Sequence, residues 1–206
     1  MVQRAERYRV RRIGSSAPLA ILAIILAGVF FAGACGQQDT QSDAESQQDA
    51  TTSEASLLPQ EIVVGLDVVQ TYFPEIEQQT ATSENSTASG TPDATRMVIY
   101  EGGDGRRVTV SVDRYPSVDA AATAFEQAID NSEAVPGFVA LPAPADVGDK
   151  AFAGSVTQGD DTHIGYGALA GENIIGVTSA GYPATTENVE KLAGLTHDAV
   201  EKATTA

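Results

Sequence analysis

Residues 151–180 read AFAGSVTQGDDTHIGYGALAGENIIGVTSA, and the pattern of this stretch decides the fold. Apolar and small residues recur in three runs, which predict the strands Ala151–Gln158, Thr162–Ala170 and Asn173–Ser179. The turns between them are short, Gly159-Asp160-Asp161 and Gly171-Glu172. Connections of this length join neighbouring antiparallel strands, so the stretch predicts an antiparallel meander.

A β-hairpin and a helix are predicted upstream of this meander. Met97–Tyr100 is an apolar run, and after a glycine-rich turn the valines of Val108–Val112 alternate with polar residues. That alternation has the period of a strand with one buried face. Apolar residues then recur at helical spacing over Val118–Ile129, and Ser117 is suited to cap the N-terminus of this helix.

Two more helices are expected at the ends of the folded region. Apolar residues recur at helical spacing from Leu57 to Phe73, and a last helix with an apolar stripe over 189–203 begins after a cap at Thr185 or Thr186. The predicted order is therefore α-β-β-α-β-β-β-α. This order predicts an α+β fold, an antiparallel sheet with helices packed on it.

The N-terminus has the pattern of an export signal. Arginines within the first 12 residues precede the apolar stretch Ala17–Ala34 and then Cys35, the single cysteine of the chain. This pattern resembles a bacterial lipoprotein signal peptide with its lipobox. The resemblance implies that a signal peptidase recognises Ala32, Gly33 and Ala34 and that Cys35 carries the lipid, palmitate included. An uncleaved transmembrane anchor is the alternative, because the apolar stretch is nearly long enough to span a bilayer.

The composition divides the chain into three parts. Residues 1–34 form the predicted signal peptide, and residues 35–56 form the lipidated cysteine and a polar tether without large apolar residues. Residues 57–206 then form a single α+β domain, whose size is usual for one hydrophobic core. Within it, residues 77–94 are again polar and low in complexity, which predicts a mobile loop.

The net charge and the single cysteine exclude some classes of partner and of chemistry. The formal net charge of the chain is −16, so its surface repels nucleic acid and anionic lipid headgroups. A lone cysteine that is lipidated leaves neither a disulfide nor a free thiol in the mature domain. We therefore expect no nucleic-acid partner and no thiol chemistry, and a fold that depends on its apolar core.

Four segments of the domain carry a resemblance to known proteins: Leu57-Leu58, Val108–Ile129, Val147-Gly148-Asp149-Lys150-Ala151 and Gly171-Glu172-Asn173-Ile174-Ile175. In these segments the domain is similar to the extracellular sensor domains of mycobacterial membrane serine/threonine kinases of the H type, and to PsbP-like lipoproteins. The resemblance implies a sensor or binding domain rather than an enzyme.

The chain carries few candidates for site chemistry. Asp160, Asp161 and His163 cluster at one predicted turn and form a weak metal-binding candidate, although aspartates are also ordinary turn residues. Tyr115 and Tyr182 each precede a proline between a strand and a helix, where aromatic rings can rim a pocket or simply close the edge of the core. No motif of a nucleophilic, phosphate-binding or metal-dependent enzyme occurs, so no catalytic residue and no cofactor are predicted.

These features predict a lipid-anchored lipoprotein on the outer face of the cytoplasmic membrane, in the cell envelope. Its domain is expected to bind a small apolar ligand or another envelope protein without catalysis. Two alternatives are an envelope enzyme with a site of scattered Asp, Tyr and His side chains, and a passive surface component. A cleft that gathers titratable groups would favour the enzyme.

Overall fold

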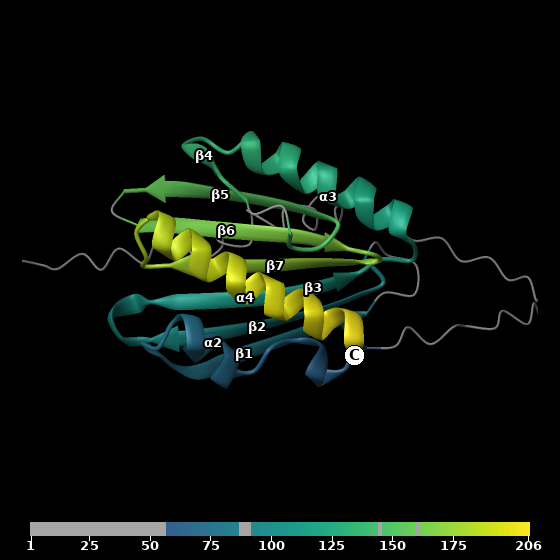
Figure 1. The fold of residues 1–206 in the computed structure, drawn as a ribbon, viewed down its shortest axis with the longest axis horizontal. Coiled ribbons are helices and arrows are strands. Elements are labelled where there is room, and N and C mark those ends of the chain that lie inside the picture. The colour runs from purple at the N-terminus through teal and green to yellow at the C-terminus, as the bar shows by residue number, and fades with distance from the viewer. Residues whose placement is uncertain (1–56, 87–91, 144–145, 160) are drawn as a thin grey trace, which may run out of the picture.

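The described part of the chain folds into one antiparallel sheet with helices on both faces. This computed structural model describes residues 57–86, 92–143, 146–159 and 161–206. The seven strands of these residues are β1 (Ile76–Ser86), β2 (Ala94–Gly102), β3 (Arg107–Arg114), β4 (Phe138–Leu141), β5 (Lys150–Gln158), β6 (Asp161–Ala170) and β7 (Asn173–Ala180). Their order in the sheet is β1-β2-β3-β7-β6-β5-β4 (Figure 1).

The predicted meander and hairpin are confirmed, and so is the α+β fold class. Strands β5, β6 and β7 pair antiparallel in sequence order, and β2 pairs with β3. The two groups meet where β3 pairs with β7, from Arg107 opposite Ala180 to Arg114 opposite Asn173. Strand β7 thus lies at the centre of the sheet, and β1 and β4 form its edges.

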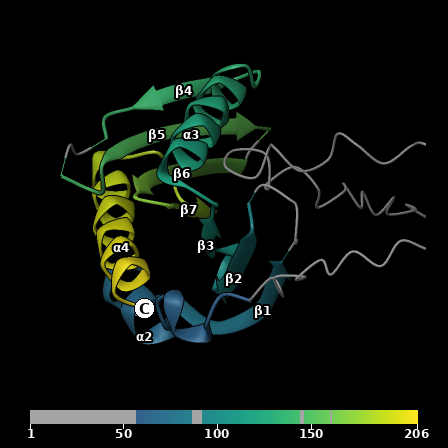
Figure 2. The ribbon, with the colours of Figure 1, turned by 90° about the vertical axis from the view of Figure 1, so that its right-hand side faces the viewer.

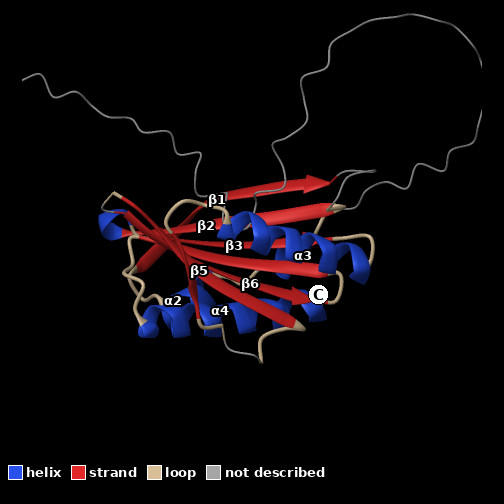
Figure 3. Ribbon diagram, turned by 90° about the horizontal axis from the view of Figure 1, so that it is seen from above, coloured by secondary structure: helices blue, strands red, loops and turns tan. Residues whose placement is uncertain are grey.

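Helices cover the two faces unequally (Figures 2 and 3). The 3₁₀ turn η1 (Gln60–Ile62), α2 (Leu66–Tyr72) and α4 (Thr186–Thr205) lie on one face, and α3 (Val118–Glu133) lies on the other. Both predicted caps are confirmed: Ser117 Oγ accepts a hydrogen bond from the Ala120 N–H at 3.2 Å, and Thr185 Oγ1 accepts one from the Asn188 N–H at 3.3 Å.

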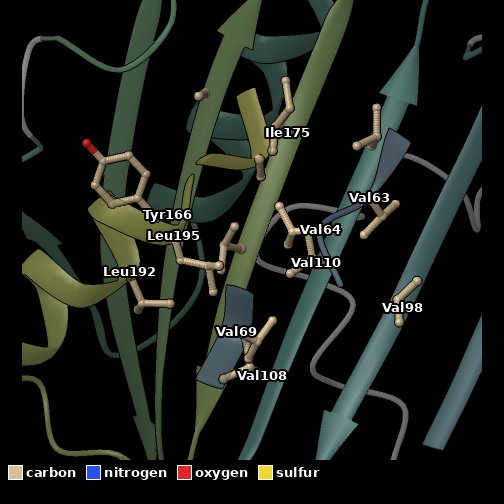
Figure 4. Close-up of a cluster of buried hydrophobic side chains, with 14 of the residues drawn as sticks. Val63, Val64, Val69, Val98, Val108, Val110, Tyr166, Ile175, Leu192 and Leu195 are labelled. Carbon is tan, nitrogen blue, oxygen red and sulfur yellow. The ribbon is translucent and has the colours of Figure 1, made fainter. Parts of the chain in front are cut away.

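The main core lies between the sheet and the helices α2 and α4. Val108 and Val110 of β3 have no exposed surface, and Figure 4 shows them beside Val69 of α2. Leu192 and Leu195 of α4 complete the same cluster. Burying an aliphatic side chain of this size contributes about 2 kcal/mol, so this cluster supplies most of the stability of the fold.

A smaller apolar cluster lies under α3 on the opposite face. Phe125 of α3 packs there with Leu169 of β6 and Ile174 of β7. Phe152 borders the cluster, and its ring stacks on Phe138 of β4 with centroids 5.7 Å apart. Helix α3 therefore connects β3, inside the sheet, to β4 at its edge while it packs on β4, β6 and β7.

The prediction of a mobile loop over residues 77–94 is wrong for residues 77–86. These residues form most of β1, which pairs with β2 from Ile76 opposite Gly102 to Ser86 opposite Ala94. Residues 77–85 are exposed, so this edge strand depends on backbone hydrogen bonds to β2 and not on apolar burial. The polar composition of residues 77–86 therefore predicts a loop where the structure has a strand. Residues 87–91 lie outside the described part.

Two further elements depart from the sequence prediction. The expected first helix divides at Gly65, which is extended (φ −79°, ψ 171°), so that only η1 and α2 form. No strand is predicted between Ile129 and Ala151, but β4 lies there, is only four residues long and pairs with β5. A strand this short between prolines carries too few residues to show a period.

Several predictions fall on residues outside the described part. They concern the signal peptide over 1–34, the lipidation of Cys35 and the tether up to residue 56, and they stay predictions. Within residues 57–206, leaving aside the three gaps named above, no helix is long and apolar enough to cross a membrane.

Candidate ligand-binding site

An apolar groove of about 310 Å³ lies between the end of β4 and the start of α4. Val189, in the first turns of α4, is only 7% exposed. Glu190 and Thr186 provide the polar groups at its border. The full lining is Leu141, Pro142, Ala143, Ala184, Thr186, Val189 and Glu190.

Both walls of this groove are fixed by the fold. On one side, Leu141 pairs with Ala153 of β5 and packs against the main core. On the other, the capping residue Thr185 sets the start of α4, and its carbonyl accepts a hydrogen bond from the Val189 N–H at 3.0 Å. The groove therefore exists before any ligand arrives, as in most small-molecule sites.

The chemistry of this lining suits binding and not reaction. Five of its seven residues are apolar, and none carries an imidazole, thiol or amine. Glu190 is its one ionisable group, and a lone exposed carboxylate without an acid or base partner cannot perform general acid–base catalysis. The groove can hold an apolar molecule and offer it hydrogen bonds at one end.

A second hollow, of about 320 Å³, lies at the opposite edge of the sheet. The chain between η1 and α2 forms one wall, and β1 and β2 form the other. Its base is buried and its rim is exposed. Its lining is Gln60, Glu61, Val63, Val64, Gly65, Gln79, Thr82, Arg96, Val98 and Tyr100. We call it the Arg96 hollow.

Arg96 is the chemically distinctive residue of this hollow, since it is an arginine only 4% exposed. Its Nε and Nη2 donate hydrogen bonds to the carbonyl of Leu58 at 3.0 and 2.7 Å. Its Nη1 lies 3.0 Å from Oε1 of Glu84, directly opposite on β1, which makes an ion pair. That contact lacks hydrogen-bond geometry, so Nη1 has no hydrogen-bond partner among the described residues.

One feature of the sequence marks Arg96 as unusual. It occupies the alternate position of β2 that Ala94, Val98 and Tyr100 use to face the main core. A charged residue at such a position is unusual and marks either a buried ion pair or a site. The groove residues from Leu141 to Val189 carried no comparable signal, because each looks like an ordinary loop or core residue.

The two tyrosines expected at a pocket rim are not brought together. Tyr115 follows β3 and packs in the cluster under α3, and its backbone N–H donates to the carbonyl of Glu172. Tyr182 follows β7 at the other end of the β3–β7 pair, in the main core on the opposite face. Neither lines the groove or the Arg96 hollow. Both positions agree with the alternative that these rings close the edges of the core.

Tyr182 lies in a packed corner. Its ring meets Phe73 edge-on at 5.0 Å between centroids, and the guanidinium carbon of Arg106 lies 5.7 Å from its centroid. Burial raises the pKa of Tyr182, and the nearby Glu75 raises it further. For Tyr115, burial and then the charge of Asp113 raise the pKa. These shifts keep both phenols neutral, so neither is prepared to act as a base.

The weak metal candidate gains no support from the described residues. Asp160 lies outside them. Asp161 and His163 open β6, and His163 is half-buried, with no hydrogen-bond partner for its Nδ1 among the described residues. Burial lowers the pKa of His163, with Asp161 acting against the shift and Arg107 adding to it. In the described residues, no group of three His, Cys, Asp or Glu side chains is placed to hold a metal ion.

The other perturbed groups are dispersed as well. Burial raises the pKa of Asp113 to about 6, although a hydrogen bond from Thr95 at 2.7 Å opposes the shift. Asp113 pairs with Ile174 at one end of β7, whereas His163 pairs with Ala180 at the other. No described cleft gathers an acid with a base, which is what the enzyme alternative requires.

Comparison with known proteins gives only distant similarities. No protein-family model matches the chain, and no curated protein sequence matches it. Among solved structures, the extracellular domain of PknH from Mycobacterium tuberculosis is 15% identical, covers 68% of this chain and 93% of its own, and has a TM-score of 0.49. A GTP binding regulator from Thermotoga maritima is 12% identical, covers 66% and 89%, and has a TM-score of 0.36. Neither similarity bears on what this chain binds.

Proposed function

We propose that the chain is a lipid-anchored extracytoplasmic protein whose domain binds a small apolar ligand without transforming it. The observation that carries this proposal is the apolar groove between β4 and α4. Its lining is predominantly apolar, its walls are fixed, and its volume of about 310 Å³ is that of a small-molecule site.

The size of the groove favours a small molecule over a protein partner. Stable protein–protein interfaces bury about 800 Å² on each side and centre on large anchoring side chains. The groove is instead a short depression with Val189 buried inside it and Glu190 at its border. A ligand with an apolar body and a hydrogen-bond donor at one end matches that distribution. An envelope protein as partner is an outcome of the test below.

The anchor rests on the N-terminal pattern. Cys35 follows the small residues Ala32, Gly33 and Ala34 at the end of an apolar stretch, which resembles a lipobox. Metabolic labelling with an alkyne analogue of palmitate tests this directly. We expect label on the wild-type chain and none on Cys35→Ser, which should also remain uncleaved. Label that persists on Cys35→Ser contradicts the lipoprotein assignment.

Ligand binding is tested by native mass spectrometry of the full chain isolated from its source, together with titration of N-phenyl-1-naphthylamine, a neutral fluorescent probe. We expect a small-molecule adduct and saturable probe binding. Ala184→Phe, which fills the groove from an exposed position, should weaken probe binding at least tenfold. Ala134→Phe, exposed at the end of α3, is the matched control and should bind normally. Equal probe binding by both variants excludes the groove. A co-isolated protein in place of an adduct would favour a protein partner.

A further inference from the structure

Ten consecutive residues without a polar side chain lie at the surface of the domain. They are residues 134–143, with the sequence AVPGFVALPA. Six of them are exposed, four are half-buried and none is fully buried. Val139, which is 57% exposed, is the most exposed large apolar side chain of the described residues. Single apolar residues are common on surfaces, but a continuous exposed stretch marks an interaction site. We call this stretch the apolar edge.

The apolar edge forms one border of the sheet, on the far side from β1 (Figure 1). Its centre is β4, which pairs with β5 over Phe138–Leu141. The ring of Phe138 stacks on Phe152 at 5.7 Å between centroids, and helix α3 contacts the strand. These contacts fix β4 in place, so its outer side presents a preformed apolar surface.

The backbone of the apolar edge is unsuited to pairing with another protein strand. Strand β4 has only four residues, and Pro136 and Pro142 stand on either side of it. Short edge strands, and prolines without an N–H group, oppose the addition of a further strand. The exposed side chains are those of alanine, proline and valine, whereas protein interfaces centre on larger anchors such as tryptophan, tyrosine and arginine. A protein partner is therefore disfavoured.

The apolar edge suits a lipid surface because it carries no charge. The net charge of the chain is −16, and the charged residues that flank the apolar edge in the sequence, Glu133 and Asp146, lie outside it. At the opposite border of the sheet, β1 carries Glu77 and Glu84. Ionised carboxylates resist transfer from water to the headgroup region of a bilayer, whereas apolar side chains favour it. Of the two borders, the apolar edge is the one that can enter a bilayer surface.

We propose that the apolar edge docks the domain on the bilayer that carries its lipid anchor, with exposed side chains such as Val139 inserted between the headgroups. This inference rests on the proposed function, because it requires a lipid on Cys35. Residues 35–56 can span up to about 75 Å when extended, and a sheet of seven strands is about 30 Å wide. The tether is thus long enough for either border of the sheet to reach the membrane.

Tethering makes a weak contact sufficient. A few small side chains inserted at shallow depth bind a bilayer only weakly when the protein is free in solution. A flexible tether instead keeps the domain near the surface at an effective concentration of about 1 mM. Leu141, Pro142 and Ala143 belong both to the apolar edge and to the lining of the apolar groove. Docking therefore places the groove beside the bilayer, which is a source of apolar ligands.

The chain contains no tryptophan, so a single introduced tryptophan reports on its own position. The test uses the full lipidated chain in vesicles of phosphatidylcholine. Val139→Trp places the reporter on the apolar edge, and Ser83→Trp places it at an exposed position of β1. We expect phosphatidylcholine with brominated acyl chains to quench the emission of Val139→Trp at least threefold more than that of Ser83→Trp. Equal quenching at the two positions overturns the proposal.

A charge added to the apolar edge shows whether the introduced tryptophan itself causes the contact. In the Val139→Trp background, Ala140→Glu should reduce the quenching at least threefold, because it adds a carboxylate to the apolar edge. Ala81→Glu, at an exposed alanine of β1, is the matched control and should leave the quenching unchanged. Equal effects of the two substitutions overturn the proposal. An emission shift of Val139→Trp that depends on the number of protein copies per vesicle assigns the edge to contacts between copies and also overturns it.

Two measurements separate this result from that of the proposed function. Lipid labelling and probe binding are measured on the same proteins, as described above. Absence of quenching at the apolar edge, with normal label on Cys35 and normal probe binding, overturns the docking alone. Absence of label on Cys35 contradicts the proposed anchor and the docking with it.

Discussion

Asp149 Oδ2 accepts a hydrogen bond from the backbone N–H of Gly171 at 2.8 Å, which joins the entry to β5 to the turn between β6 and β7. The Asp149 N–H in turn donates to the carbonyl of Leu169 at 2.7 Å. Gly148 lies against that carbonyl with φ +69°, where a Cβ atom would come within 2.5 Å of the oxygen. The two sequence phrases around residues 148 and 171 therefore belong to one structural feature, which fixes the register of the meander.

Asp149→Ala should lower the free energy of unfolding by about 1 kcal/mol, because it removes one charge-assisted hydrogen bond at an exposed turn. Chemical denaturation measures this loss, and amide hydrogen exchange at Gly171 localises it. Asp149→Asn keeps an acceptor oxygen and should retain most of the stability. If the Gly171 amide exchanges at the same rate in all three proteins, the hydrogen bond does not hold the turn.

Much of the fold can be predicted from the spacing of apolar residues alone. The elements that this spacing does not predict have identifiable physical causes. The alternation of Val108, Val110 and Val112 is visible in the sequence because one face of β3 is completely buried. Strand β1 has no such face, since its residues 77–85 are exposed and backbone pairing with β2 holds it in place. The spacing of apolar residues reveals a strand only where one face of that strand is buried. It cannot reveal a strand that is held by backbone hydrogen bonds alone.

The sites were less predictable than the fold, because both hollows are made by elements distant in sequence. Arg96 gives a local signal, a charge at a core-facing position, but its partner Glu84 lies within a stretch that composition assigns to a loop. The groove is lined by both Leu141 of β4 and Val189 of α4, which are far apart in the sequence. Tyr115 and Tyr182 both stand between a strand and a helix in the sequence, yet they pack in two different cores.

Gly194 of α4 allows the ring of Tyr72 to lie against the helix. A Cβ atom at residue 194 would come within 2.5 Å of Tyr72 Cε1, and the Tyr72 hydroxyl donates to Asp198 Oδ2 at 2.9 Å. Gly194→Ala should therefore destabilise the protein by about 1–2 kcal/mol, as overpacking does, measured by denaturant unfolding. In an ordinary helix interior the same change is stabilising by about 0.5–1 kcal/mol.

A double-mutant cycle isolates this contact. In a Tyr72→Ala background the ring is absent, so Gly194→Ala should now increase stability, as helix propensity alone dictates. The sign of the effect of Gly194→Ala should thus reverse between the two backgrounds. The same sign in both would mean that Tyr72 does not require the glycine.

His163 should titrate below the ordinary value for histidine. Burial lowers its pKa, Arg107 adds to the shift, and Asp161 acts against it. NMR titration of the His163 ring measures the pKa. Arg107→Gln should raise it and Asp161→Asn should lower it further. Shifts of the same direction in both variants would contradict this arrangement of charges.

Asp113 makes stability fall as the pH rises from about 4 to about 6. Its pKa is raised from 3.8 to about 6, mainly by burial, so in this window the folded state binds a proton that the unfolded state has lost. Protonation then favours folding, and the stability it provides is lost as the pH passes through the folded pKa. The total change from this group is on the order of 2 kcal/mol, allowing for its partial exposure.

Asp113→Asn provides the test, because it removes the titration while it leaves a group that can still bond to Thr95. The difference in free energy of unfolding between Asp113→Asn and the wild type should grow in favour of the variant between pH 4 and pH 6, and then stay constant up to pH 8. If the difference in free energy of unfolding between Asp113→Asn and the wild type did not change with pH, the carboxylate would already be ionised in the folded protein at pH 4. The hydrogen bond from Thr95 would then outweigh burial.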